Sequence, residues 1–193
     1  MRAKAKITAA VLALSFAVTS YAAVDIDAIH YDDTAVVADS ELVLNGAGMR
    51  KKVFFKVYAA GLYLPAKASD GSEVFGQKGA ARVRLGLLRD VSASSFVSAL
   101  EEGLKDNTDE KTRTEIASEI AALIEAMNKI GDVKEGDVVD FDFSGTATSV
   151  SVNGKPVADN LGGRRLFDAV LGIWLGKNAI DDKLKKGLLG QSK

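Results

Sequence analysis

Arg50 is the first residue whose type and position could do chemistry. It follows a segment that contains Gly46 and Gly48, and it precedes residues 53–64, which are apolar and rich in aromatic side chains. A guanidinium beside so much apolar surface is costly unless it meets water, a carboxylate or an anionic ligand. Arg50 is therefore either an anion clamp at a pocket mouth or a turn arginine that solvates a strand end, and spacing alone favours the second interpretation.

The two glycines leave a similar choice open. Gly46 and Gly48 predict a turn that delivers Arg50 to the following strand, because glycine tolerates positive φ. They are equally consistent with a close approach of the backbone to a ligand.

Tyr58 is the second candidate. In a regular strand it shares one face with Lys56, and the small residues that follow it (Ala59, Ala60 and Gly61) leave room for either a helix or a ligand. A buried Tyr58 hydroxyl needs a polar partner, which Arg50, a ligand or water could supply.

The remaining chemically capable residues favour structural roles. His30 is the only histidine and lies in a polar stretch with no nucleophile at a telling spacing. Asp140 and Asp142 share a strand face and could act as paired carboxylates, although such residues are more often the wet side of a half-buried strand. An arginine pair, residues 164–165, opens a helix-like segment and could bind an acid group, but most such pairs are solvated.

Composition excludes several function classes. The chain has 193 residues, 47% of them hydrophobic, which suits a single domain with a real core. It contains no cysteine, so a thiol nucleophile, a Cys-ligated metal and a disulfide framework are excluded. No basic cluster with interleaved aromatics suggests nucleic-acid binding. We expect no metal and no cofactor.

The first 23 residues predict a secretory signal peptide. Arg2, Lys4 and Lys6 form a basic region, residues 7–18 are apolar, and Ala22-Ala23 end a small-residue cleavage site. The apolar run is too short for a stable membrane span. We therefore expect a periplasmic or secreted protein with one mature domain, residues 24–193. That domain has 22 basic and 26 acidic residues, a net charge of −4.

Periodicity predicts an α+β fold. Strands are expected at 41–44, 53–64 and 82–88, and again at 138–143, 148–152 and 155–157, where Asn153-Gly154 signals a hairpin. Helices are expected from Ser92 or Ser94 to about residue 104, from 108 to 130, from 161 to 174, and from 181 to 189. Residues 66–78 are expected to form a loop. A largely antiparallel sheet with helices packed on one face accommodates this order.

Four stretches together resemble the chalcone isomerase family. The first two, Asn45-Gly46-Ala47-Gly48-Met49-Arg50 and Lys56-Val57-Tyr58-Ala59-Ala60-Gly61-Leu62-Tyr63-Leu64, are similar to the family's Gly-Gly-Ala-Gly-x-Arg and Lys-Phe-Thr-x-Ile-Gly-Val-Tyr-Leu segments. The others are Leu88-Arg89-Asp90 with Phe96, and residues 175–185. The likeness is to exported bacterial chalcone isomerase-like proteins.

The resemblance implies an open-faced β-sandwich with a ligand cleft between sheet and helices. In the plant enzymes, the arginine that matches Arg50 orients the substrate and stabilises an enolate. In fatty-acid-binding relatives, the same arginine holds a carboxylate.

Other family positions depart from the enzymes. The family threonine in the second segment falls on Tyr58, and the C-terminal one falls on Ile173, which has no hydroxyl. The enzymes' tyrosine and asparagine are expected on a helix over 108–127, which contains neither. Since losing one oxyanion donor costs ~10²–10³ in rate, efficient cyclisation is not expected.

Three hypotheses follow. The preferred one is a non-catalytic protein that binds a small amphipathic acid, such as a fatty acid, through Arg50, Tyr58, Lys56 and Ile173. The alternative is an intramolecular lyase (isomerase) acting on an enone-like substrate, with Arg50 as electrophile and Tyr58 as acid. The third is an envelope component that binds a protein partner. None of them calls for nucleic acid or for a membrane span after cleavage of the signal.

Overall fold

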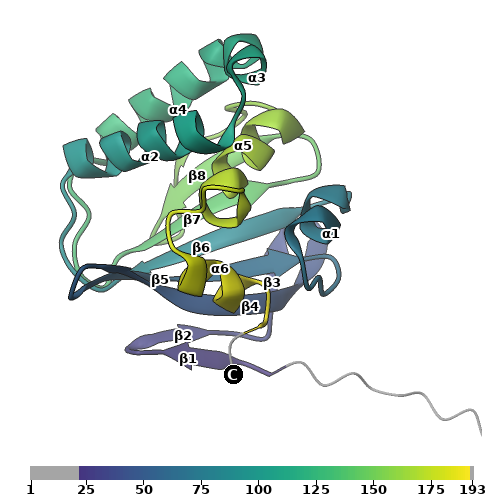
Figure 1. The fold of residues 1–193 in the computed structure, drawn as a ribbon, viewed down its shortest axis with the longest axis vertical. Helices are drawn as coiled ribbons and strands as arrows, with labels where there is room; N and C mark the ends of the chain where they lie inside the picture. The colour runs from purple at the N-terminus through teal and green to yellow at the C-terminus, as the bar shows by residue number, and fades with distance from the viewer. Residues whose placement is uncertain (1–21, 192–193) are drawn as a thin grey trace, which may run out of the picture.

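The computed structural model describes residues 22–191, which form a curled antiparallel sheet with helices packed on one side (Figure 1). All but the last two residues of the expected signal peptide lie outside this range. None of the helices in the described range has the length and apolar character needed to cross a bilayer.

The strands are β1 (Val24–Ile26), β2 (Ile29–Tyr31), β3 (Thr34–Val37), β4 (Ser40–Lys52), β5 (Phe55–Leu64), β6 (Ala81–Leu87), β7 (Val138–Phe143), β8 (Thr148–Val152) and β9 (Lys155–Ala158). The helices are α1 (Gly71–Gly76), α2 (Ala93–Asn107), α3 (Glu110–Glu115), α4 (Ala117–Ile130), α5 (Arg164–Leu175) and α6 (Asp182–Leu188).

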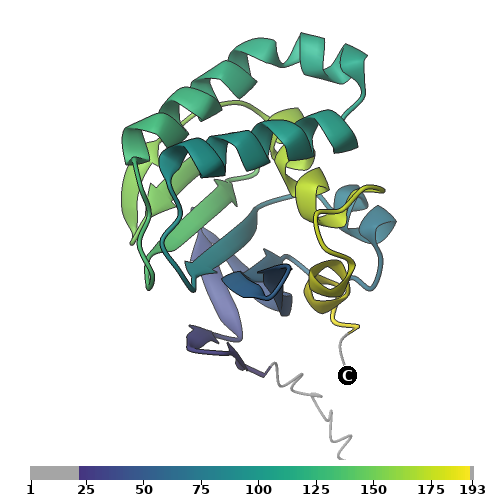
Figure 2. The ribbon, with the colours of Figure 1, turned by 60° about the vertical axis from the view of Figure 1, so that its left-hand side comes forward.

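The sheet runs in simple sequence order from β3 to β9, and every pairing is antiparallel. Helices α2 and α4 lie side by side above it, α5 packs between α2 and the sheet, and α4 packs on β9 (Figure 2). The predicted α+β class with helices on one face is confirmed. The Asn153-Gly154 turn between β8 and β9 is confirmed too, with both residues at positive φ as a tight hairpin turn requires.

Both faces of the sheet are packed. On the helix side, β5 contributes Ala60, Leu62 and Leu64 to the main core. On the other side, Ala59 and Tyr63 join a smaller core beneath β1 and β2, where a Cβ on Gly61 would lie 2.5 Å from the Tyr31 ring. Two of the small residues of β5, Ala59 and Gly61, therefore accommodate packed protein on this second face.

The glycine-bracketed turn expected before Arg50 is absent. Residues 45–50 lie inside β4, a continuous strand of 13 residues, and the turn comes later, at Val53 and Phe54. Gly46 and Gly48 instead let α6 lie directly on β4. A Cβ on Gly46 would lie 2.2 Å from the carbonyl oxygen of Gly187, a distance that no real contact tolerates. The close approach is real, but the approaching group is a helix of this chain.

The structure differs from the expected elements in one helix, in one loop and in the strands that begin the domain. The helix expected over 108–130 is divided into α3 and α4 at Ile116, whose backbone leaves the helical region. The loop expected over 66–78 contains α1, because Asp70 caps a helix there by accepting a bond from the amide of Glu73. Strands β1 to β3 have no counterpart in the periodicity, since runs of three or four residues are too short to show a period.

Candidate functional site

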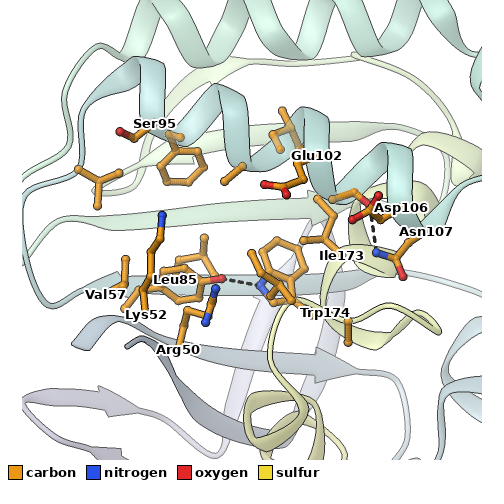
Figure 3. A pocket seen from close by; sticks show the side chains of 18 of the residues that line it. Arg50, Lys52, Val57, Leu85, Ser95, Glu102, Asp106, Asn107, Ile173 and Trp174 are labelled. Carbon is orange, nitrogen blue, oxygen red and sulfur yellow. Dashed lines mark hydrogen bonds between the residues drawn. The ribbon is translucent and has the colours of Figure 1, made fainter. Parts of the chain in front are cut away.

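A cavity of about 570 Å³ lies between the curled sheet and α2, within the size range of small-molecule pockets (Figure 3). Its floor comes from β4, β5 and β6, its roof from α2, and one of its ends from α5 and residues 178–180. Most of the wall is apolar, including Val57, Leu85, Leu87, Phe96, Phe141 and Ile173.

Arg50 brings a cation to this apolar wall from β4. Its side chain is only 18% exposed, and its Nη1 lies 3.4 Å from Oδ2 of Asp181. A strong pair between a guanidinium and a carboxylate has a separation of ~2.7–2.9 Å, so this contact is a weak one. Nη1 also donates to the carbonyl of Lys51, whereas Nε and Nη2 have no hydrogen-bond partner among residues 22–191. The guanidinium therefore keeps donors available to an anion.

Asp181 restrains Arg50 because it also caps α6. Its Oδ1 accepts bonds from the amides of Lys183 and Leu184, at 2.9 and 3.1 Å, and its Oδ2 faces Arg50. The cap fixes the carboxylate, and the carboxylate in turn sets where the guanidinium rests. A ligand that binds Arg50 must compete with Asp181.

Tyr58 stands directly opposite Arg50 in the register of β4 and β5. The indole Nε1 of Trp174 donates a 2.9 Å bond to its hydroxyl oxygen. Burial raises the pKa of Tyr58 to about 12, an effect that the indole bond and the Arg50 charge only partly offset. The hydroxyl therefore stays protonated at neutral pH and, with the indole as its donor, can itself donate to a ligand beside Arg50.

Lys56 lies outside the cavity, contrary to the expectation that it shares a face with Tyr58. A β-bulge changes the register, because Arg50 pairs with Tyr58 while Lys51 pairs with Lys56, which leaves Val57 as an extra residue. Beyond the bulge the alternation is inverted. The ammonium of Lys56 consequently forms a 3.0 Å ion pair with Asp27, on the opposite side of the sheet.

Ile173 lines the cavity at its α5 end, and its side chain is entirely aliphatic. It is 4% exposed and tightly packed, since a Cβ on Gly103 of α2 would lie 2.8 Å from its side chain. The polar group that α5 supplies to the site is the indole of the next residue, Trp174.

Several cavity residues were not anticipated. Lys52 sends its ammonium into the cavity two residues after Arg50 (Figure 3), and alternation would have identified it had residues 45–52 been interpreted as a strand. Glu102 and Asp106 lie one helical turn apart on α2, at the exposed rim. Asn107 also lines the cavity, but its amide is occupied by the backbone of Gly103 and Asn178.

The charged candidates on the sheet lie on its other face. Arg84 forms two bonds with Asp140, at 2.8 and 2.9 Å, and Arg82 forms two bonds of 2.6 Å with Asp142. This ladder uses both carboxylates structurally, and neither side chain lines the cavity.

The remaining candidates are also structural. His30 is exposed, and its bond to Asp25, at 2.6 Å, raises its pKa. Arg164 is bonded to Asp168 and to the carbonyl of Gln77, both at 2.7 Å, and Arg165 pairs with Glu115. Among residues 22–191 no three acidic or histidine side chains gather closely enough to hold a metal ion.

Comparison with known proteins gives the same architecture. A family model described as chalcone isomerase-like matches residues 23–190. Among solved structures, a fatty-acid binding protein of Arabidopsis thaliana superposes with a TM-score of 0.64 at 16% sequence identity, covering 86% of this chain and 95% of that protein. At this identity the likeness shows the shared fold alone. No curated protein matches the sequence.

Proposed function

The chain belongs to the chalcone isomerase-like family, and on that premise we propose that it is a non-catalytic protein that binds a small amphipathic acid, such as a fatty acid. The observation that carries the proposal is Arg50, a cation with free donors on the wall of a mostly apolar cavity. A ligand with an apolar chain and one carboxylate matches this wall, because the chain can contact the apolar lining while the carboxylate binds the Arg50 guanidinium.

The polar groups suit binding better than catalysis. Arg50 and Lys52 supply positive charge, and Tyr58 supplies one neutral donor. Burial makes Tyr58 a weaker acid than a free phenol, because its pKa lies near 12. At Ile173 there is no hydroxyl that could hold a substrate carbonyl. These features support a site that holds a carboxylate without transforming it.

The test uses the only tryptophan of the chain, Trp174, as its probe. Because the indole lines the cavity, we expect dodecanoate to change its fluorescence, whereas dodecanol of equal chain length binds more weakly. Replacing Arg50 by Ala removes charge-assisted bonds worth ~1.5–3 kcal/mol, an expected loss of roughly 10- to 100-fold in affinity.

Asp181→Asn gives a change of the opposite sign. Asparagine keeps an oxygen for the α6 cap but removes the negative charge beside Arg50, so affinity for dodecanoate should rise on the order of threefold or more. Lys129→Ala removes an exposed charge on α4, away from the cavity, and should leave binding unchanged. Equal affinity for the acid and the alcohol, or an unaltered Arg50→Ala variant, would contradict the proposal.

Export to the periplasm or the medium forms a second part of the proposal. It is supported by the basic and apolar regions of residues 1–18 and by the small residues that end at Ala23. N-terminal sequencing of the protein released from a bacterial host by osmotic shock should begin at Val24. Recovery of the intact N-terminus from the cytoplasm would refute it.

A further inference from the structure

The tip of the β4–β5 hairpin exposes a compact apolar group. Val53, Phe54 and Phe55 are 78%, 92% and 63% exposed, and Val36 is the only other large hydrophobic residue so exposed among residues 22–191. Three consecutive exposed apolar side chains at a hairpin tip are unusual, because a soluble surface normally scatters them singly.

The backbone at this tip is strained in order to present these side chains. Val53 has φ of +56°, in the left-handed region that favours glycine or asparagine and penalises a β-branched residue. A turn built for stability alone would carry a different residue there. The exposed valine is therefore a sign of function at the tip.

Basic residues flank the apolar tip. Lys51 and Lys52 precede it, although the ammonium of Lys52 turns into the cavity, and Lys56 follows it. The guanidinium of Arg89 lies 5.2 Å from the centre of the Phe55 ring. Of the three lysines, only Lys56 has an ion-pair partner within residues 22–191, which is Asp27. The domain as a whole is acidic, with 22 basic and 26 acidic residues from position 24 onward, so this cationic end stands out against the overall charge.

From this combination we propose that the hairpin tip docks the protein on an anionic lipid surface. Aromatic side chains enter the interface between headgroups and acyl chains, while lysines and arginines bind the anionic headgroups. The tip adjoins the cavity, since Arg50, Lys52 and Val57 line it from the same hairpin (Figure 3). Docking would bring the hairpin side of the cavity to the membrane, although the docking itself does not depend on the proposed ligand.

The experiment measures co-sedimentation of the purified protein with vesicles at 0.1 M salt and without fatty acid. We expect binding to vesicles of equal parts phosphatidylglycerol and phosphatidylcholine, and little binding to phosphatidylcholine alone. Lys51→Gln should weaken binding about fivefold, as one basic residue near the surface contributes. A double variant, Phe54→Ser with Phe55→Ser, should weaken it at least about tenfold.

The Val53→Asn variant distinguishes a loss of vesicle binding from a loss of folding stability. Asparagine suits the left-handed turn, so this variant should unfold at a higher temperature than the parent while it binds vesicles less tightly. Val36→Ser, on β3 beside the opposite end of β4, removes a comparably exposed apolar side chain and should change vesicle binding by less than about twofold.

Three results would overturn the proposal. The first is a parent protein that ignores anionic vesicles, and the second is binding that survives the double phenylalanine variant. The third is self-association that buries the tip, seen as a concentration-dependent dimer that the double variant abolishes, in the absence of vesicle binding. Trp174 titrations with dodecanoate on the same variants test the cavity separately, because tip substitutions should leave solution affinity intact.

Discussion

Gly46→Ala should disrupt the packing of α6 on β4. The added Cβ would lie 2.2 Å from the carbonyl oxygen of Gly187 and 2.8 Å from the amide nitrogen of Gly190, whereas ordinary contact begins at 3.4 Å. Both atoms belong to backbone, which cannot rotate away as a flexible side chain can. The helix must therefore retreat by about 1.2 Å at this point, the difference between 3.4 and 2.2 Å.

The retreat of the helix has an energetic cost with two parts. Overpacking of this kind costs ~1–3 kcal/mol. The retreat also stretches the 2.7 Å bond from the Asn45 amide to the carbonyl of Leu188, which adds about 1 kcal/mol. For a chain of this size, a total of about 2–4 kcal/mol lowers the melting temperature by roughly 4–16 °C.

The assay is thermal and urea unfolding followed by circular dichroism. Gly76→Ala is the matched control, because a Cβ there meets no atom within 4 Å, and it should be neutral or stabilise by ~0.4–1 kcal/mol. Gly187→Ala tests the same interface from the helix side, because its Cβ would lie 2.6 Å from the carbonyl oxygen of Ala47. It should lower the melting temperature by a similar amount to Gly46→Ala. If Gly46→Ala melts within about 1 °C of the parent, the close-approach explanation of this glycine is wrong.

Two further predictions concern buried titratable and charged groups. Burial raises the pKa of Tyr58 and of Tyr63 to about 12 in the folded protein. In the unfolded chain these hydroxyls lose their protons near pH 10. The free energy of unfolding should therefore fall as the pH rises from 10 to 12. Urea unfolding at several pH values should show a decline that Tyr58→Phe reduces by up to about 1.4 kcal/mol per pH unit. Asp140→Ala should lower the free energy of unfolding by about 3 kcal/mol, because it leaves Arg84 unpaired on a covered sheet face. Glu125→Ala, in an exposed helix pair, should cost under ~1 kcal/mol in the same denaturation assay, and equal effects would contradict the burial argument.

Much of the fold could be predicted from local patterns. The strands from β5 to β9 and helices α2, α5 and α6 coincide closely with the expected ranges, since each is long enough or well enough capped to show its period. The short strands β1 to β3 and helix α1 were missed, because three to six residues carry too little periodic signal. Their positions are set by what they pack against.

The lining of the cavity was predicted in part. Arg50, Tyr58 and Ile173 all line the cavity, whereas Lys56 does not, because a single bulge at Val57 inverts the alternation between Lys56 and Tyr58. A bulge depends on how two strands pair, and the sequence of either strand alone does not predict it. Lys52 was missed for a related reason, since the segment before it was expected to be a turn.

The amino-acid sequence by itself determined the class of fold, the family and the absence of thiol chemistry, and it identified Arg50 as the first candidate for ligand binding. These depend on residue types and on spacings within one segment, which do not change with the way distant segments pack. Only the tertiary structure decided what surrounds the arginine. Asp181 lies 131 residues away in sequence yet 3.4 Å away in space, and Trp174 reaches Tyr58 across 116 residues. Such contacts arise from the packing of α5 and α6 against the sheet, a long-range event that no local pattern encodes.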